Sequence, residues 1–125
     1  MENILKFEPI YKERVWGGRS IETIYERRLP KAELKYGESW EIVDRPGDQS
    51  KVVDGEYHGK TLNYLWNNYR EDIFGQGMPD TDRFPLMIKI LDARKKLSLQ
   101  VHPPQSICHI LDAEPKTELW YIAHA

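Results

Sequence analysis

The chain has 125 residues and a mass of 14.8 kDa, with 18 basic and 20 acidic side chains and a formal net charge of −2. This balance argues against a nucleic-acid partner, and a hydrophobic share of 40% excludes a disordered chain. No apolar run is long enough to span a bilayer, no signal peptide is recognisable, and a single cysteine, Cys108, fits a reducing compartment, so we expect one cytoplasmic domain over residues 1–125 without membrane contact.

The first half of the chain predicts short elements separated by turns. The first ten residues predict an extended segment, and paired glycines at Trp16-Gly17-Gly18 predict a turn. Ser20 is expected to cap a short helix that ends before Pro30. Strands are predicted at Glu38–Asp44 and Lys51–Asp54, separated by a turn at Pro46-Gly47-Asp48.

The clearest helix begins at Thr61. Leu62, Leu65, Trp66 and Tyr69 fall at positions i, i+3, i+4 and i+7, which places them on one face of a helix. The glycines, the proline and the polar residues that follow, up to Arg83, predict a loop.

The last third predicts strands. Leu86–Asp92 and Leu97–His102 are expected to form an antiparallel hairpin, which Pro103-Pro104 ends. Gln105–Leu111 predicts a helical turn, and Thr117–Ala123 predicts a third strand. Because this strand reaches almost to the chain end, where an uncovered edge would favour aggregation, we expect the sequence to lack a carboxyl-terminal part.

One face of the segment Leu97–His102 carries polar side chains that could bind a metal ion. Side chains alternate along a strand, so Ser98, Gln100 and His102 share the face opposite the apolar residues. If Thr117–Ala123 is a neighbouring strand, Glu118 can complete a set of three metal ligands with Gln100 and His102. Imidazole and carboxylate groups are ordinary zinc donors, whereas an amide oxygen also suits manganese or iron. The alternative is a solvated sheet face without a metal.

Four short sequence motifs resemble those of a known family. They are VWGGR (residues 15–19), GESWE (37–41), LSLQVHP (97–103) and KTELWY (116–121). Together and in this order they resemble the type I phosphomannose isomerases, which are zinc-dependent mannose-6-phosphate isomerases of the cupin superfamily, and the short bacterial form in particular. The resemblance implies a mainly β fold with a cupin (jelly-roll-like) barrel, incomplete in this chain, and a small helical portion.

The resemblance also implies roles for individual residues. Gln100, His102 and Glu118 match zinc ligands, with one Zn²⁺ per site, and the family's fourth ligand, a histidine, would lie beyond this chain. The remaining matches are to the phosphosugar site: Lys89, Lys116 and Ser98.

The implied reaction interconverts mannose 6-phosphate and fructose 6-phosphate, with the phosphosugar as the expected partner. The catalytic base is not assigned to any residue of this chain. A second copy or a complementary chain is expected to complete the barrel. The alternative function is a non-catalytic cupin module that binds a metal or a sugar.

Overall fold

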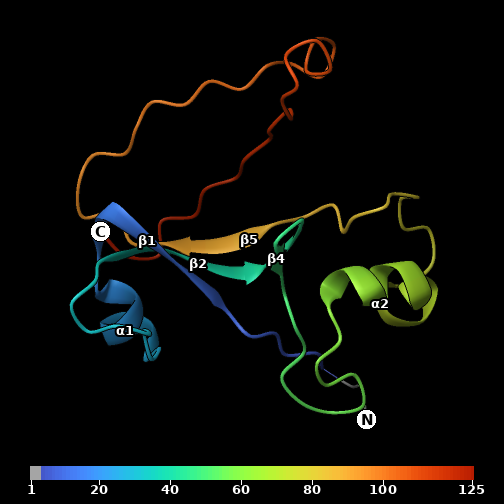
Figure 1. Ribbon diagram of the computed structural model, residues 1–125, viewed down its shortest axis with the longest axis horizontal. Coiled ribbons are helices and arrows are strands. Elements are labelled where there is room, and N and C mark those ends of the chain that lie inside the picture. The colour runs from blue at the N-terminus through green and yellow to red at the C-terminus, as the bar shows by residue number, and fades with distance from the viewer. Residues whose placement is uncertain (1–3) are drawn as a thin grey trace.

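The computed structural model describes residues 4–125 (Figure 1). A three-stranded sheet and a helical segment form the body of the molecule, and the last thirty residues form a long arm that leaves the sheet and returns to it (Figure 1). The elements in chain order are β1 (Ile10–Gly18), α1 (Ser20–Tyr25), β2 (Tyr36–Ile42), β3 (Asp44–Arg45), β4 (Asp48–Gln49), α2 (Leu62–Asn68), the π-helical turn η1 (Arg70–Phe74) and β5 (Ile88–Leu91).

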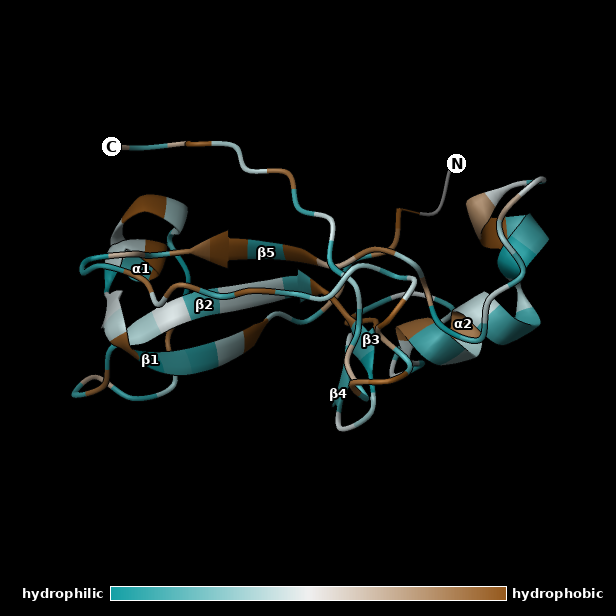
Figure 2. Ribbon diagram, turned by 90° about the horizontal axis from the view of Figure 1, so that it is seen from above, coloured by the Kyte–Doolittle hydropathy of each residue, from teal (hydrophilic) through white to brown (hydrophobic). Residues whose placement is uncertain are grey.

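The main sheet has the order β1-β2-β5 and is antiparallel throughout. The register places Tyr11, Ser39 and Ile90 in one row across the three strands. Tyr11 and Ile90 pack against a core cluster of Ile21, Leu29 and Tyr36, to which α1 contributes Ile21. One face of the sheet is therefore apolar and covered by α1. Figure 2 shows β5 as largely hydrophobic, as expected for a strand that contributes to this core.

A second buried cluster surrounds α2. Thr61 caps the helix by accepting a hydrogen bond from the backbone N–H of Tyr64 at 3.1 Å. This agrees with the predicted start of the helix at Thr61. Trp66 is fully buried, with its ring 5.2 Å from Phe74 and 5.2 Å from Phe84. Its indole N–H donates to the carbonyl of Thr81 at 2.8 Å. This packing fixes the loop that leads into β5.

The predicted turn at Trp16-Gly17-Gly18 is wrong, because these residues form the end of β1. A Cβ atom at Gly17 would overlap the backbone atoms of Tyr36 and Gly37, so the glycine allows β1 and β2 to approach closely.

Replacing Gly17 with alanine should destabilise the fold by about 1–3 kcal/mol, since the new methyl group meets backbone that has no room to move. Gly18→Ala is the matched control, because its Cβ would meet mainly the flexible side chain of Arg94. Urea unfolding of both variants measures the difference. Equal losses of stability would contradict the steric explanation.

Several other predicted elements differ from the structure. Lys51–Asp54 contains only isolated bridges, at Lys51 and Val52, and Ser20 is the first residue of α1 rather than its cap. Neither Leu97–His102 nor Thr117–Ala123 forms a strand. The physical reason is the path of the chain after β5: the backbone N–H groups of Arg94 and Lys95 donate to the carbonyl of Trp16, at 2.9 and 3.2 Å, so the chain turns toward β1 instead of folding back along β5.

Two further expectations agree with the structure, those for β2 and β5 and for the turn after Pro104. β2 and β5 lie within the predicted strands 38–44 and 86–92, apart from two residues at the start of β2. Residues 105–112 form consecutive turns, where a helical turn was predicted. Among residues 4–125, no helix has the length and apolar character needed to cross a membrane.

Candidate functional site

The second face of the sheet is polar and carries a buried carboxylate. Glu38 lies in the middle of β2 and is 6% exposed. One of its oxygens pairs with Lys89 Nζ at 2.9 Å, and the other with an Arg14 guanidinium nitrogen at 2.8 Å. The Trp40 indole N–H also donates to Glu38, at 3.2 Å, while Lys12 lies over the Trp40 ring at 4.4 Å. All three strands thus contribute cations or donors to one carboxylate.

The charge of Glu38 is stabilised by these partners. Burial by itself raises the pKa of the Glu38 carboxyl, because the low-dielectric interior disfavours the anion. The hydrogen bond and charge of Lys89, together with Trp40 and Arg14, outweigh burial and hold the pKa of Glu38 below its ordinary value. The carboxylate is therefore ionised at neutral pH and fixes the ammonium group of Lys89 on the sheet.

The returning part of the arm carries two further predicted site residues. Lys116 Nζ pairs with Glu118 at 2.6 Å. The hydrogen bond from Lys116 is the largest cause that lowers the pKa of Glu118, and the charge of Lys89 lowers it as well. Met87 and Pro115 line the same hollow. Lys89, two residues after Met87, and Lys116, directly after Pro115, therefore belong to neighbouring stretches of chain although they are far apart in the sequence.

The other three predicted site residues lie on the outgoing part of the arm. Gln100 donates a long hydrogen bond of 3.4 Å to Ser98 Oγ, and Gln100 and His102 are exposed. Figure 1 shows the outgoing part, in orange, and the returning part, in red, as separate limbs. Within residues 4–125, no three His, Cys, Asp or Glu side chains gather where they could share a metal ion. The structure thus pairs Lys116 with Glu118 on the returning limb, whereas Ser98, Gln100 and His102 lie on the outgoing limb.

Sequence reasoning missed the ion cluster around Glu38. It identified Glu38 only as the first residue of a predicted strand. A signal was present, since Lys89 interrupts the apolar run of β5 and Glu38 stands in a segment flanked by aromatic residues. Two opposite charges in two apolar strands suggest that these strands are neighbours and that the charges pair.

Comparison with known proteins places the chain in a family. Residues 4–118 match the family described as phosphomannose isomerase type I, catalytic domain. The chain belongs to this family. The match includes all six predicted site residues, from Lys89 to Glu118.

Individual relatives agree with the family. The chain is 42% identical to mannose-6-phosphate isomerase ManA of Bacillus subtilis over 120 residues, which cover 94% of this chain and 36% of the relative. It is 39% identical to the probable mannose-6-phosphate isomerase GmuF of the same organism over 124 residues, which cover 98% of this chain and 38% of the relative. The chain therefore spans little more than a third of the length of these type I phosphomannose isomerase relatives.

A solved structure confirms the expected fold class. The crystal structure of mannose 6-phosphate isomerase from Bacillus subtilis superposes with a TM-score of 0.75 at 34% identity, over 86% of this chain and 33% of that one. The fold is mainly β and of the cupin type, with 23% strand and 15% helix. In residues 4–125 the sheet is open and does not close into a barrel.

Proposed function

We propose that this chain is part of a mannose-6-phosphate isomerase, an aldose-ketose isomerase that interconverts mannose 6-phosphate and fructose 6-phosphate. The observation that carries the proposal is the family match over residues 4–118, supported by relatives named as mannose-6-phosphate isomerases. We further propose that added strands, from a second copy or a complementary chain, complete the barrel. This part of the proposal is supported by the open sheet, in which β1 and β5 each have one neighbouring strand.

The proposed role of Lys89 and Lys116 is to bind the phosphosugar. A phosphate dianion requires cationic groups, and lysine supplies a compact point charge with three donors. The ion pair between Lys116 and Glu118, together with the lowering of the Glu118 pKa by the charge of Lys89, supports a shared basic surface at this position. Ser98 would add a hydroxyl group from the outgoing limb of the arm.

The donor set proposed for a metal is Gln100, His102 and Glu118. Because these residues lie on the outgoing and returning limbs of the arm, the two limbs would have to come together when the metal binds. The chemistry of these side chains fits Zn²⁺, since imidazole nitrogen and carboxylate oxygen are common zinc ligands. The lowered pKa of Glu118 favours the anion that a metal requires, and Gln100 and His102 are exposed and accessible. Bound zinc would polarise the oxygen atoms on C1 and C2 of the open-chain sugar.

The residues of this chain would bind and orient the substrate. Isomerisation moves a proton between C1 and C2, which requires the sugar to be held in one orientation relative to a base. Lys89, fixed by Glu38, and Lys116 would hold the phosphate end of the sugar. We assign the base to none of the residues in this chain.

Zinc content tests the proposed site. The purified chain should bind about one zinc ion, and His102→Ala and Glu118→Ala should each remove it, because each takes one ligand from the set. His109→Ala is the matched control, since His109 is a second exposed histidine of the arm. Atomic absorption after dialysis measures the ratio. Zinc retained in both ligand variants would contradict the assignment.

A coupled assay of mannose 6-phosphate turnover tests the activity itself. Turnover that is lost in His102→Ala and retained in His109→Ala would support an isomerase. Zinc binding without turnover would instead indicate a metal-binding cupin module.

A further inference from the structure

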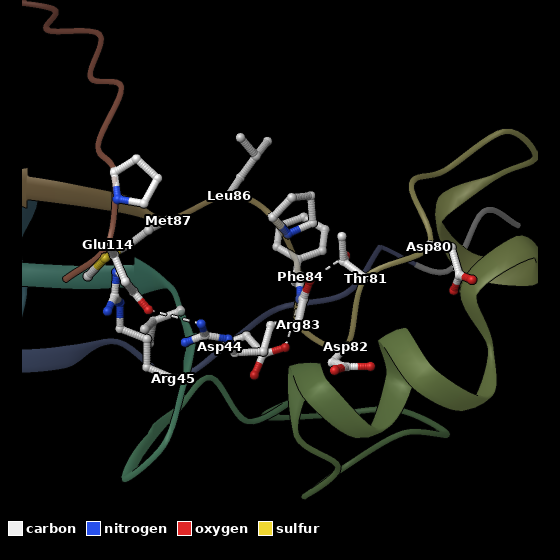
Figure 3. Close-up of a pocket in the computed structure, with 13 residues that line it drawn as sticks. Asp44, Arg45, Asp80, Thr81, Asp82, Arg83, Phe84, Leu86, Met87 and Glu114 are labelled. Carbon is white, nitrogen blue, oxygen red and sulfur yellow. Dashed lines mark hydrogen bonds and ion pairs between the residues drawn. The ribbon is translucent and has the colours of Figure 1, made fainter. Parts of the chain in front are cut away.

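A single side chain makes the ion pairs that connect the returning limb of the arm to the body in the described part of the chain. Glu114 pairs with Arg45 of β3 at 3.0 Å and with Arg83 of the loop before β5 at 2.9 Å, using a different carboxylate oxygen for each (Figure 3). Between residues 96–125 and the rest of the described chain, these are the only ion pairs. We call this group of three side chains the Glu114 clasp.

Both arginines of the clasp come from anchored backbone. Asp44, the neighbour of Arg45, is 6% exposed, and one of its oxygens accepts the N–H of Phe84 at 2.8 Å. Since Phe84 directly follows Arg83, this bond ties the two arginine-bearing segments together. The carbonyl of Arg83 also accepts a hydrogen bond from the Thr81 hydroxyl at 2.7 Å. The two guanidinium groups therefore have fixed attachment points.

The clasp borders a hollow of about 640 Å³ between β3, the loop before β5 and the returning limb. Figure 3 shows Glu114 at the edge of this hollow, with Arg45 and Arg83 directed toward its carboxylate. The hydrogen bond from Arg83 and the charge of Arg45 hold the pKa of Glu114 below its ordinary value, which agrees with a shared anion. All three side chains are about half exposed, at 47%, 47% and 51%. One such pair alone would stabilise the fold little, but two cations on one carboxylate form a small network.

The residue after Glu114 is a proline, which restricts the backbone path from the clasp to Lys116 and Glu118. Pro115 fixes its own φ angle and restricts Glu114 to extended backbone. An extended chain advances at most about 3.6 Å per residue, so Lys116 lies within about 7 Å and Glu118 within about 14 Å of the clasped residue, measured along the backbone. Holding Glu114 thus limits where both side chains can be.

We propose that Glu114 is a positioning residue, which places Lys116 and Glu118 beside Lys89 through its ion pairs with Arg45 and Arg83. A role of this placement in binding the phosphosugar rests on the proposed function, but the position of Lys116 and Glu118 does not depend on it. Without the clasp, the returning limb would keep no ion pair to the body among the described residues, and Lys116 would sample a much larger volume.

The test is a lysine-to-lysine cross-link in the full chain. A short amine-reactive cross-linker should join Lys89 to Lys116, and mass spectrometry should measure this product relative to singly modified Lys89. In Glu114→Gln the ratio should fall about fivefold, because the loss of a tether lowers the effective concentration of one lysine near the other. The double variant Arg45→Gln/Arg83→Gln should show the same fall in the cross-link ratio. Adding Glu114→Gln to this double variant should lower the ratio no further.

Asp112→Asn is the matched control. It removes one negative charge from the same limb, forms no ion pair with the described residues, and has a φ angle of 46°, which asparagine tolerates. Its cross-link ratio should equal that of the parent chain. An unchanged ratio in Glu114→Gln, an equal loss in Asp112→Asn, or no cross-link in the parent would each overturn the proposal. Because no substrate is present, failure of the isomerase assay would leave this result unaffected.

Discussion

Replacing Glu38 with glutamine is expected to lower the free energy of unfolding by about 1.5–3 kcal/mol, the usual range for hydrogen bonds to a charged group, because the carboxylate is buried while Lys89 and Arg14 remain 25% and 38% exposed. The glutamine keeps the shape of the side chain but leaves Arg14 and Lys89, which both contact this carboxylate, as neighbouring cations without a counter-ion. Chemical denaturation of the parent chain and the variant measures the difference.

Glu41→Gln is the matched control for this substitution. Glu41 lies on the same strand and pairs with Arg27 at 3.1 Å, but its side chain is 20% exposed and does not contact Lys89. The expected loss is below about 1 kcal/mol, as for other solvent-accessible pairs. Equal losses in the two variants would show that the buried cluster has no special role.

The pH dependence of stability supplies a second readout for Glu38. Its pKa in the folded chain is lowered, so the folded state binds the proton less tightly than the unfolded state does. The contribution of Glu38 is present above the ordinary carboxyl value near 4.5 and is lost as the pH falls through the lowered folded-state pKa. Glu38→Gln should reduce this loss, while Glu114 and Glu118, whose pKa values are also lowered, account for part of the remaining slope.

Trp66→Ala is expected to cost about 3–5 kcal/mol, since it empties a fully buried site between two aromatic rings. It also leaves the Thr81 carbonyl without its indole donor. Trp120→Ala is the matched control, because Trp120 is 53% exposed in the arm and should change stability little. Urea unfolding followed by circular dichroism separates the two. A large loss in Trp120→Ala would mean that the arm is packed more tightly than its exposure indicates.

Elements with a local signal were predictable from the sequence. The spacing of Leu62, Leu65 and Trp66 indicates one helical face, and Thr61 supplies the cap, so α2 follows from a dozen neighbouring residues. The apolar run that contains β5 is equally local. Family resemblance supplied the cupin class, which periodicity alone did not select.

The elements that were predicted wrongly depend on backbone segments far away in the sequence. Alternation in residues 97–102 indicates which side chains would share a face, but a strand also needs a neighbouring backbone to accept its hydrogen bonds. In the same way, Gly17 follows a turn pattern, yet its role is to let β1 approach Gly37 of β2. Local patterns do not contain this information.

The candidate site divides in the same manner. Lys89, Lys116 and Glu118 could be named from sequence motifs, and the structure pairs Lys116 with Glu118. Glu38 could not be identified as the partner of Lys89, because their contact depends on how β2 and β5 pair. The contributions of Arg45 and Arg83 to the clasp depend likewise on the return path of the arm.

The strand order also determines when the ion cluster can form during folding. Glu38 and Lys89 are 51 residues apart, and the whole α2 segment lies between them. Closing so long a loop is entropically costly, and such non-local contacts form slowly. We therefore expect β1, β2 and the α2 segment to become ordered before β5 docks. Lys89 would then reach Glu38 only in the last stage, so the basic surface would exist only in chains that have finished folding.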